Sequence, residues 1–437
     1  MQKLIAFLLL IATLLTMVSC SSDLKMDEKQ TITEEIKTEE KETEEPLPTG
    51  EIVIPEGFSV GYNRQSVAPE VFPVQTYTHF NHVGYSNHDP VQLTCTAISD
   101  GKTTFLMISL DIRGVDTGFV DYSTRLIEKA VGIPKEQVFI NSTHTHSAPD
   151  NSHLGEGNLK QWVQLYYKRL VRAVTLAMHD LTPAEAYIGT SHTEGVTFVR
   201  RYLMDTGRYV TNPGADDGNA VAHESEADTE LRTIRFDREG DKKDVLMVNY
   251  QTHYHGTFAT QVSADFVHPL RQKIEKELDV HFAYHNGASG NLNFNSHIKG
   301  EKKYNTLEKA AYAIGDTVID AVSKEEKANL DTLQHEASYF QSRKGQEVRL
   351  YAFTIGDIGF VSAPYEMFDT NGVQIRQASP CKMTFVCAYT NGHMGYCPSK
   401  EAFPHGAYEV ESSPFSEGDG EEFAGELVRL LHLCKDK

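Results

Sequence analysis

Apolar and polar positions follow two periods along this chain, and each period predicts one kind of element. An apolar run rich in β-branched and aromatic residues predicts a buried strand at residues 103–112. Further segments predict strands at residues 137–142, 184–191, 229–237, 244–253, 281–291 and 383–391, the segment 281–291 passing into a glycine-rich turn. Apolar residues three and four apart predict helices at residues 121–132, 158–181, 306–324 and 420–434, and within 266–279 after its proline. Residues 347–368 predict a hairpin that turns at Gly356 and Asp357. Strands and helices alternate first and strands cluster later, which predicts an α/β fold of mixed sheets with flanking helices in a single large domain.

The first fifty residues follow a different pattern. Lys3 precedes an apolar run and the small residue Ser19, which is the layout of a secretory signal peptide over residues 1–20. The letters MVSC resemble a bacterial lipobox, so we expect lipidation at Cys20, an ordinary signal peptide with a chance cysteine being the alternative. Residues 21–50 hold ten acidic residues, four lysines and no aromatic residue, which predicts a disordered acidic tether, or alternatively an acidic docking tail. The expected location is the bacterial cell envelope, lipid-anchored and extracytoplasmic, with the folded domain at 51–437.

Composition narrows the possible partners. The net charge of −20 argues against nucleic acid, whose phosphates would be repelled. Five cysteines besides Cys20 show no CxxC spacing and are odd in number, so neither a disulfide framework nor a cysteine-ligated zinc is indicated. No protein partner is evident from the sequence.

Two pairs of histidines follow predicted strands. His144 and His146 come after the strand 137–142, and His253 and His255 end the strand 244–253 or follow it. Alternate residues of an extended chain face the same side, so each pair is expected on one face. Imidazole is a common zinc ligand, and strand ends are where α/β proteins collect binding groups. A metal site, a catalytic pair and polar residues that merely end a strand all remain open on the pattern alone.

Three common hydrolase patterns are not met. A metallo-β-lactamase-like site needs HxHxDH, whereas the chain continues with Ser147, alanine and proline after its second histidine. Barrel amidohydrolases carry HxH on their first strand, whereas this pair lies about 90 residues into the domain. Ser147 is not part of a GxSxG elbow, so a serine hydrolase is not indicated.

The segment NSTHTHSAPD at 141–150 resembles the histidine motif of the neutral/alkaline (non-lysosomal) ceramidase family, which are zinc amidases. Further segments resemble that family's motifs in the same order: FVRRYLMDTGRY at 198–209, VNYQTH at 248–253, VSADF at 262–266, NGASGNLN at 286–293, SAPYEMF at 362–368 and YTNGHMGY at 389–396. The resemblance covers roughly residues 50–430. With the chain ending at Lys437, it implies the N-terminal catalytic domain of such enzymes without their C-terminal β-sandwich.

The resemblance implies a role for each of six residues. Zinc (Zn2+) would be held by two imidazoles, a carboxylate and a phenolate: His144, His253, Glu366 and Tyr396. His146 would lie beside the zinc-activated water and pass a proton to the leaving amine, and Arg200 would face the polar head of the substrate. Each role has an alternative. Arg200 and the adjacent Arg201 could form ordinary surface ion pairs, and Tyr396 could be a tyrosine of the hydrophobic core. His393 or His255 could bind the metal in place of one of the four ligands.

The implied activity is hydrolysis of the amide bond of ceramide or another N-acyl lipid by an exported zinc enzyme. The alternatives are a zinc hydrolase for a non-lipid substrate and a non-catalytic surface-binding lipoprotein with this fold. One departure bears on mechanism, since Asn291 and Asn293 stand where the family has aspartate and serine. A serine nucleophile at that place is impossible, which favours a zinc-activated water, with altered activity as the alternative.

Overall fold

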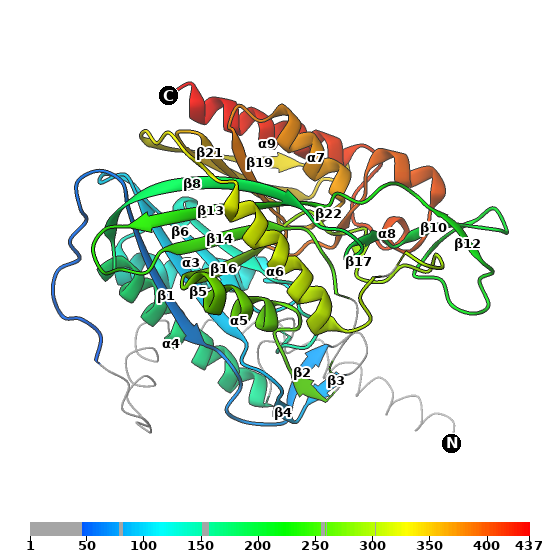
Figure 1. Ribbon diagram of the computed structural model, residues 1–437, viewed down its shortest axis with the longest axis horizontal. Helices are drawn as coiled ribbons and strands as arrows, with labels where there is room; N and C mark the ends of the chain where they lie inside the picture. Colours follow the sequence, from blue (N-terminus) through cyan, green and yellow to red (C-terminus); the bar gives the residue numbers. More distant parts are fainter. Residues whose placement is uncertain (1–45, 78–81, 151–156, 255–257, 259, 302) are drawn as a thin grey trace, which may run out of the picture. The chain divides into compact units, whose positions relative to one another are not determined.

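The computed structural model describes residues 46–77, 82–150, 157–254, 258, 260–301 and 303–437 (Figure 1). The predicted signal peptide, Cys20, almost all of the tether and His255 lie outside these residues. Among the helices that are described, none is long and apolar enough to cross a bilayer. The five cysteines after residue 50 are all free.

A mixed sheet forms the larger of the two central layers. In the described part of the chain it has nine strands: β1 Ser59–Ser66, β5 Gln92–Ser99, β6 Thr104–Leu110, β7 Val138–Ser142, β8 Thr182–His192, β13 Glu230–Arg238, β14 Val245–Tyr250, β16 His281–Asn286 and β18 Glu326–Lys327. Their order is β16-β14-β13-β8-β1-β5-β6-β7, with β18 paired to β8. The pairs β6–β7 and β14–β16 are parallel, and the other neighbours are antiparallel.

A second sheet has the order β19-β20-β21-β23. Its strands are β19 Leu333–Gln341, β20 Glu347–Ile355, β21 Ile358–Ser362 and β23 Met383–Cys387. The predicted hairpin is β20–β21, and β21 and β23 run parallel. The helices are α3 Thr117–Val131, α4 Gly157–His179, α5 Val267–Leu278, α6 Leu307–Ser323, α7 Asp369–Ala378, α8 Tyr408–Glu411 and α9 Asp419–Lys435, and Lys135–Gln137 and Lys400–His405 form short 3₁₀ helices.

Short strand pairs join the loops at one end of these sheets. They are β2 Val74–Tyr77 with β3 His82–Gly84, β4 Ser86–Asn87 with β15 Gln261–Val262, β9 Phe198–Val199 with β17 Leu292–Asn293, and β22 Glu366–Met367 with β24 Tyr396–Cys397. A three-stranded sheet, β11-β10-β12, is built from β10 Arg201–Met204, β11 Tyr209–Thr211 and β12 Ala220–His223.

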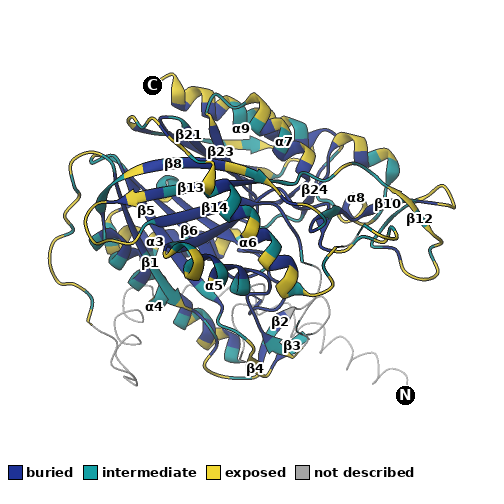
Figure 2. Ribbon diagram, in the orientation of Figure 1, coloured by how far each residue is buried: buried dark blue, intermediate teal, exposed yellow. Residues whose placement is uncertain are grey.

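The two large sheets pack face to face between two layers of helices (Figures 1 and 2). Aromatic side chains fill the space between the sheets, where Phe105 stacks on Phe353 at 3.9 Å between ring centroids and Phe353 on Phe360 at 4.3 Å. Helices α3 to α6 cover the outer face of the larger sheet, and α7 and α9 cover the smaller one. Burial of apolar side chains in these layers is the main stabilising contribution.

Two helices begin earlier than the sequence predicts. Helix α3 starts at Thr117, four residues before the predicted start, because the side chain of Asp116 accepts a hydrogen bond from the Phe119 N–H at 2.8 Å and caps the helix. Helix α5 starts before its proline, not after it. Pro269 lies in the first turn, where its missing N–H would have no partner in the helix.

Candidate functional site

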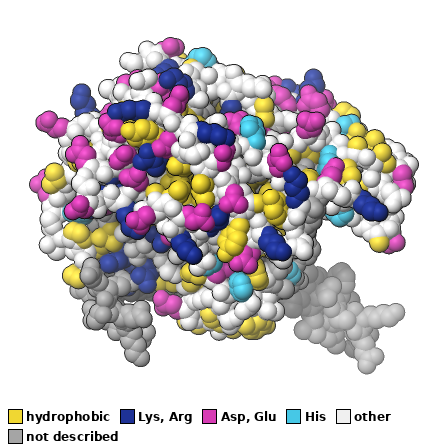
Figure 3. Space-filling model, in the orientation of Figure 1, with side chains coloured by type: hydrophobic (Ala, Val, Ile, Leu, Met, Phe, Trp, Pro, Cys, Tyr) yellow, Lys and Arg dark blue, Asp and Glu magenta, His cyan; other side chains and the backbone are white. Residues whose placement is uncertain are grey.

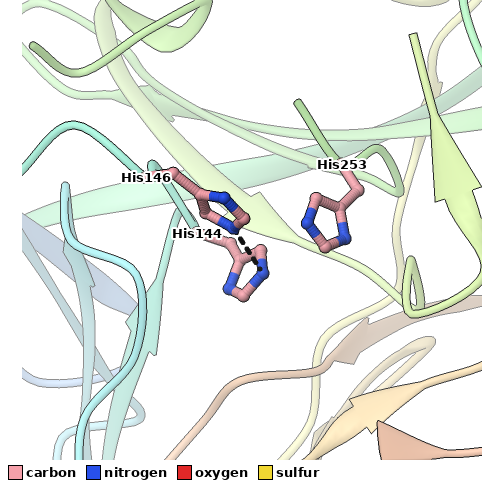
Figure 4. Close-up of side chains that lie close together, drawn as sticks. All are labelled: His144, His146 and His253. Carbon is pink, nitrogen blue, oxygen red and sulfur yellow. Dashed lines mark hydrogen bonds between the residues drawn. The ribbon is translucent and has the colours of Figure 1, made fainter. Parts of the chain in front are cut away.

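Three buried histidines converge where β7 and β14 end (Figure 4). His144, His146 and His253 each place a ring nitrogen within 4.8 Å of the other two. The Nε2 atoms of His144 and His146 are 3.3 Å apart, and the ring centroids of His144 and His253 are 4.5 Å apart. All three side chains are at most 3 % exposed. Such a buried cluster of imidazoles could hold a metal ion.

The pairing of His144 with His146 does not come from an extended chain. Strand β7 ends at Ser142, and His144 has a φ of 67°, in the left-handed region that few residues other than glycine adopt. The backbone therefore turns between the two histidines while their rings still meet. Strained backbone of this kind is typical of functional sites, where the surrounding structure holds it in place.

Two buried asparagines bring the strand ends of the two sheets together. Asn141 in β7 donates from Nδ2 to the carbonyl oxygen of Ala388 at 2.6 Å, and Asn249 in β14 donates to that of Val386 at 3.1 Å. Oδ1 of Asn249 also accepts from the Val386 N–H at 3.2 Å. These bonds tie both histidine-bearing strands to β23 of the second sheet. The segments that follow the strands are thereby held around one point.

His144 is held in one tautomer. Its Nδ1 lies 2.6 Å from the carbonyl oxygen of Arg113, which can only accept, so Nδ1 carries the proton and Nε2 presents a lone pair to the cluster. Burial lowers the pKa of His144 and, together with the nearby guanidinium of Arg200, lowers the pKa of His253 well below its usual value. Both rings are therefore neutral at pH 7, which is the form that binds metals.

Glu366 lies next to the histidines, and Tyr396 is its neighbour on the adjacent strand. Strands β22 and β24 are parallel, and Glu366 is the register partner of Tyr396. Oε2 of Glu366 is 3.4 Å from Nε2 of His144 and 4.0 Å from Nδ1 of His253, and it makes no hydrogen bond within the described residues. Burial, followed by the charge of Glu366, raises the pKa of Tyr396 well above its usual value, so a cation would be needed to ionise this phenol.

This donor set fits a divalent metal of zinc type. It offers neutral imidazoles and one buried carboxylate oxygen that lacks a hydrogen bond, which is the mixture of nitrogen and oxygen ligands that zinc accepts. His393, the competing candidate, lies farther out, with its Nε2 3.2 Å from Oε1 of Glu366 and its ring centroid 6.0 Å from that of His144. Its contact orients the carboxylate. His255, the other competitor, lies outside the described residues.

Arg200 is buried beside the cluster and not on the surface. Its Nη1 lies 3.2 Å from Nδ1 of His253, its Nη2 donates to the carbonyl oxygen of Gly290 at 2.9 Å, and its guanidinium carbon is 5.3 Å from the ring centroid of Tyr396. Nε donates to Oε1 of Glu409 at 2.8 Å. The guanidinium is therefore fixed with one edge toward the histidines, and a cation in this position suits recognition of a polar substrate group.

The α8 segment supplies two residues that the motif comparison did not single out. Glu409 is fully buried and also accepts from Arg201 at 2.9 Å and from Thr211 at 2.6 Å, so one carboxylate holds two adjacent arginines. Tyr408, half-exposed, contacts Tyr396 with ring centroids 5.4 Å apart. In the sequence these residues are a single Tyr-Glu pair in a polar segment without hydrophobic periodicity, so no pattern indicates that they belong to the site.

We predict that Glu409→Gln lowers the free energy of unfolding by about 3–5 kcal/mol, because it leaves two buried guanidinium groups without their shared counter-charge. Burial would raise the pKa of Glu409, but Arg200 and Arg201 lower it overall. The stabilisation is therefore present above the unfolded pKa of about 4.5 and is lost on acidification below it.

Urea-induced unfolding measures the loss of stability in Glu409→Gln. The control is Glu224→Gln, since Glu224 pairs with Arg201 but not with Arg200 and is less buried. An equal loss in both variants would contradict the prediction.

The glycine-rich segment packs directly against β22. A Cβ at Gly290 would lie 2.4 Å from the carbonyl oxygen of Glu366, so only glycine permits this approach. Asn291 donates to Oδ1 of Asp369 at 2.7 Å, and Asn293 donates to Oδ1 of Asn212 at 2.9 Å. The two asparagines that replace the family's aspartate and serine are therefore buried, and each donates a hydrogen bond to a neighbouring side chain, one a carboxylate and the other an amide.

The VSADF segment supports the loop that carries the histidines. The hydroxyl of Thr145, between His144 and His146, lies 2.5 Å from Oδ2 of Asp265 and 2.9 Å from the carbonyl oxygen of Ser263. Ser263 in turn donates its N–H to the carbonyl oxygen of Ser147 at 2.9 Å. The sequence motifs are therefore neighbours in space, although more than a hundred residues separate them.

No protein-family model matches the chain, and no curated protein matches it in sequence. Among solved structures, it is similar to the neutral ceramidase from Pseudomonas aeruginosa, with a TM-score of 0.70 and 14% sequence identity over 87% of this chain and 75% of that one. The chain has the neutral ceramidase fold. A structure of a ceramidase complexed with C2 gives the same TM-score and identity over 87% of this chain and 76% of that one. The predicted mixed α/β architecture and the resemblance to ceramidases are confirmed as a shared fold.

Proposed function

We propose that the protein is a zinc-dependent amidohydrolase of ceramidase type. One observation carries the proposal: on a neutral ceramidase fold, His144 and His253 lie within 4.0 Å of a buried carboxylate oxygen of Glu366 that makes no hydrogen bond in the described chain. The residues that would hold the ion are the two histidines, Glu366 and Tyr396. Zinc bound there would lower the pKa of water to about 7 and polarise an amide carbonyl.

Two further residues act on the substrate in this proposal. His146 lies against His144 and can hold or release a proton at Nε2, so it would protonate the leaving amine. Arg200, fixed by Glu409, would orient a polar group of the substrate. The burial of both side chains excludes water from the reacting groups, which strengthens their electrostatic interactions.

Ceramide or another N-acyl lipid is the proposed substrate class, since both structural neighbours are ceramidases. A non-lipid amide is the second candidate, favoured by a cavity with many amide side chains beside the site. Nucleic acid is not proposed as a partner, because the net charge is −20 and basic side chains lie among acidic ones on the face in Figure 3.

The test is hydrolysis of N-acyl compounds by the full-length protein after dialysis against a chelator and after addition of one equivalent of zinc. We expect release of free amine only in the zinc-loaded sample. An increase in rate with acyl-chain length would support a lipid substrate, and rates independent of chain length would favour the non-lipid alternative. If protein with full zinc content releases no amine from any N-acyl compound, the proposed amidase activity is wrong. The remaining alternative is then a non-catalytic binding lipoprotein.

We also propose that the protein is anchored in the bacterial cell envelope through a lipid on Cys20, with the acidic segment as its tether. Cys20→Ala is expected to leave the precursor unprocessed or the protein soluble, because each buried methylene of an acyl chain contributes about 0.8 kcal/mol to membrane binding. Membrane fractionation with size analysis measures this. Cys95→Ala, at a cysteine in the core, should not change the location. A Cys20→Ala protein of mature size that still pellets with membranes would contradict the proposal.

A further inference from the structure

A cavity of about 340 Å³ lies beside the candidate site, within the size range of small-molecule pockets. Tyr254, the residue after His253, lines one side of it. Asn293 and Asn212 line another. Asn293 in β17 is the register partner of Phe198 in β9, two residues before Arg200, and the Asn212 N–H donates to the Arg200 carbonyl oxygen at 2.8 Å. The cavity is therefore placed to take a part of the substrate next to the reacting amide.

The described residues that line this cavity are largely polar, with amide, hydroxyl and imidazole groups. Four asparagine side chains and His297 line it, and among the residues that the structure describes no lysine, arginine, aspartate or glutamate does. Phe294 and Tyr304 add aromatic rings to that of Tyr254. Amide groups both donate and accept hydrogen bonds, as hydroxyl groups do, whereas a hydrocarbon chain offers them no hydrogen bond. The described lining offers no arginine or lysine that would pair with a phosphate or carboxylate, whereas its amides suit a neutral polar group.

Asn293 gives the most specific indication. It is 3 % exposed, and its Nδ2 donates to Oδ1 of Asn212 at 2.9 Å. Its Oδ1 accepts no hydrogen bond from any described residue. A buried amide oxygen without a donor is uncommon in proteins and is normally satisfied by water or a ligand. Because this residue lines the cavity, a hydroxyl or amide N–H placed there would supply the missing donor.

We propose that this cavity is a subsite for a neutral, hydroxyl-rich group of the substrate, such as a sugar ring attached to the amide nitrogen. The proposal rests on the proposed amidase function, and it narrows the substrate class from N-acyl compounds in general to those with a polyhydroxylated group beside the amide. The asparagine side chains bind the hydroxyls, and the rings of Tyr254 and Tyr304 cover the apolar C–H face of the sugar.

The experiment compares two probes of similar size that share the same acetamide. N-acetylglucosamine carries hydroxyls on its ring, and N-cyclohexylacetamide carries none. We expect the full-length protein to bind N-acetylglucosamine at least about tenfold more tightly in calorimetric or NMR titrations, because the second probe has no ring hydroxyl to donate to Oδ1 of Asn293. The titrations are run on metal-free and zinc-loaded protein, so that binding is read independently of turnover.

Variants localise the binding. Asn305→Ala, at an exposed residue whose loss should not disturb folding, and Asn212→Ala are each expected to weaken N-acetylglucosamine binding by about fivefold or more. The matched control is Gln374→Ala, an exposed amide that lines a different cavity of about 420 Å³. Equal binding of the two probes, or an equal loss in the control variant, would overturn the subsite.

The two proposals fail in different ways. If N-acetylglucosamine binds at Asn212 and Asn305 but zinc-loaded protein hydrolyses no amide, the amidase function is wrong and the subsite stands as a sugar-binding site. If zinc-loaded protein hydrolyses amides but kcat/KM is no higher for N-acetylglucosamine than for N-cyclohexylacetamide, the subsite is wrong and the proposed amidase function stands.

Discussion

Replacing His144 or His253 by alanine is expected to remove the bound zinc, reducing its content from about one ion per chain to a small fraction of that. Either variant should lose amidase activity to the same extent as the chelated wild-type protein. The reason is geometric, since the two imidazoles come from different strands, β7 and β14, and approach the same carboxylate oxygen of Glu366 from two directions. With one of them missing, the site is open on one side and the remaining donors no longer surround an ion.

The effect should be larger for these residues than for residues that only orient them. Removal of a group that supports a ligand typically lowers metal affinity by about 10–100-fold, which excess zinc can overcome. We therefore expect added zinc to restore metal content in His393→Ala, where only the contact to Oε1 of Glu366 is lost, but not in His144→Ala.

Elemental analysis of the purified variants measures the outcome, with thermal unfolding as a check on folding. His223→Ala is the control, because His223 is a half-buried histidine bonded to the carbonyl oxygen of Val199 and to Glu301, away from the cluster. It should keep full zinc content. Wild-type zinc content in both His144→Ala and His253→Ala would show that the cluster is not the metal site.

The core strands were predictable from the sequence because their apolar runs are continuous. Strands β6, β7, β14 and β23 are buried on both faces between helices and a second sheet, so nearly every side chain in them is apolar. Strands β1 and β5 were not predicted. Their letters, SVGYNRQS and QLTCTAIS, mix polar with apolar residues, and they are strands because they pair with each other along their full length.

Two further elements escaped prediction for opposite reasons. Strand β19, LQHEASYFQ, lies at the edge of its sheet and is mostly half-exposed, so its sequence shows neither an apolar run nor strict alternation. Helix α7, DTNGVQIRQA, has few apolar residues and no side-chain cap, and it is held by packing against α9 and β23. In both, tertiary contacts decide the structure rather than local preference.

The sequence predicts which residues of the candidate site follow strands, but it does not predict how these residues are arranged in space. His144, His253 and Glu366 each follow an apolar strand, and the structure brings ring nitrogens of both histidines within 4.0 Å of Oε2 of Glu366. The sequence does not say which strands are neighbours, because that depends on hydrogen bonds such as those of Asn141 and Asn249 to β23. The left-handed turn at His144 is likewise set by the surrounding loops rather than by the residue itself.

His146→Ala is expected to keep its zinc and to lose turnover by about 10²–10⁴-fold, which is the usual contribution of a general acid or base. His146 is the third histidine of the cluster, and its Nε2 lies 3.3 Å from that of His144. Two arrangements would explain this position. As a ligand, it would share the ion with His144 and His253; as a proton carrier, it would lie beside the ion and act on the leaving amine.

The proton carrier is the arrangement we favour, because Glu366 and Tyr396 already stand in register on β22 and β24 as the remaining donors. His146→Gln sharpens the test, since glutamine keeps a polar side chain but cannot transfer a proton at neutral pH. It should retain zinc and show the same loss in kcat as alanine, with little change in KM. Zinc lost from His146→Ala as completely as from His144→Ala would instead make His146 a ligand. Wild-type rates in a zinc-loaded His146→Ala protein would show that this histidine takes no part in the chemistry.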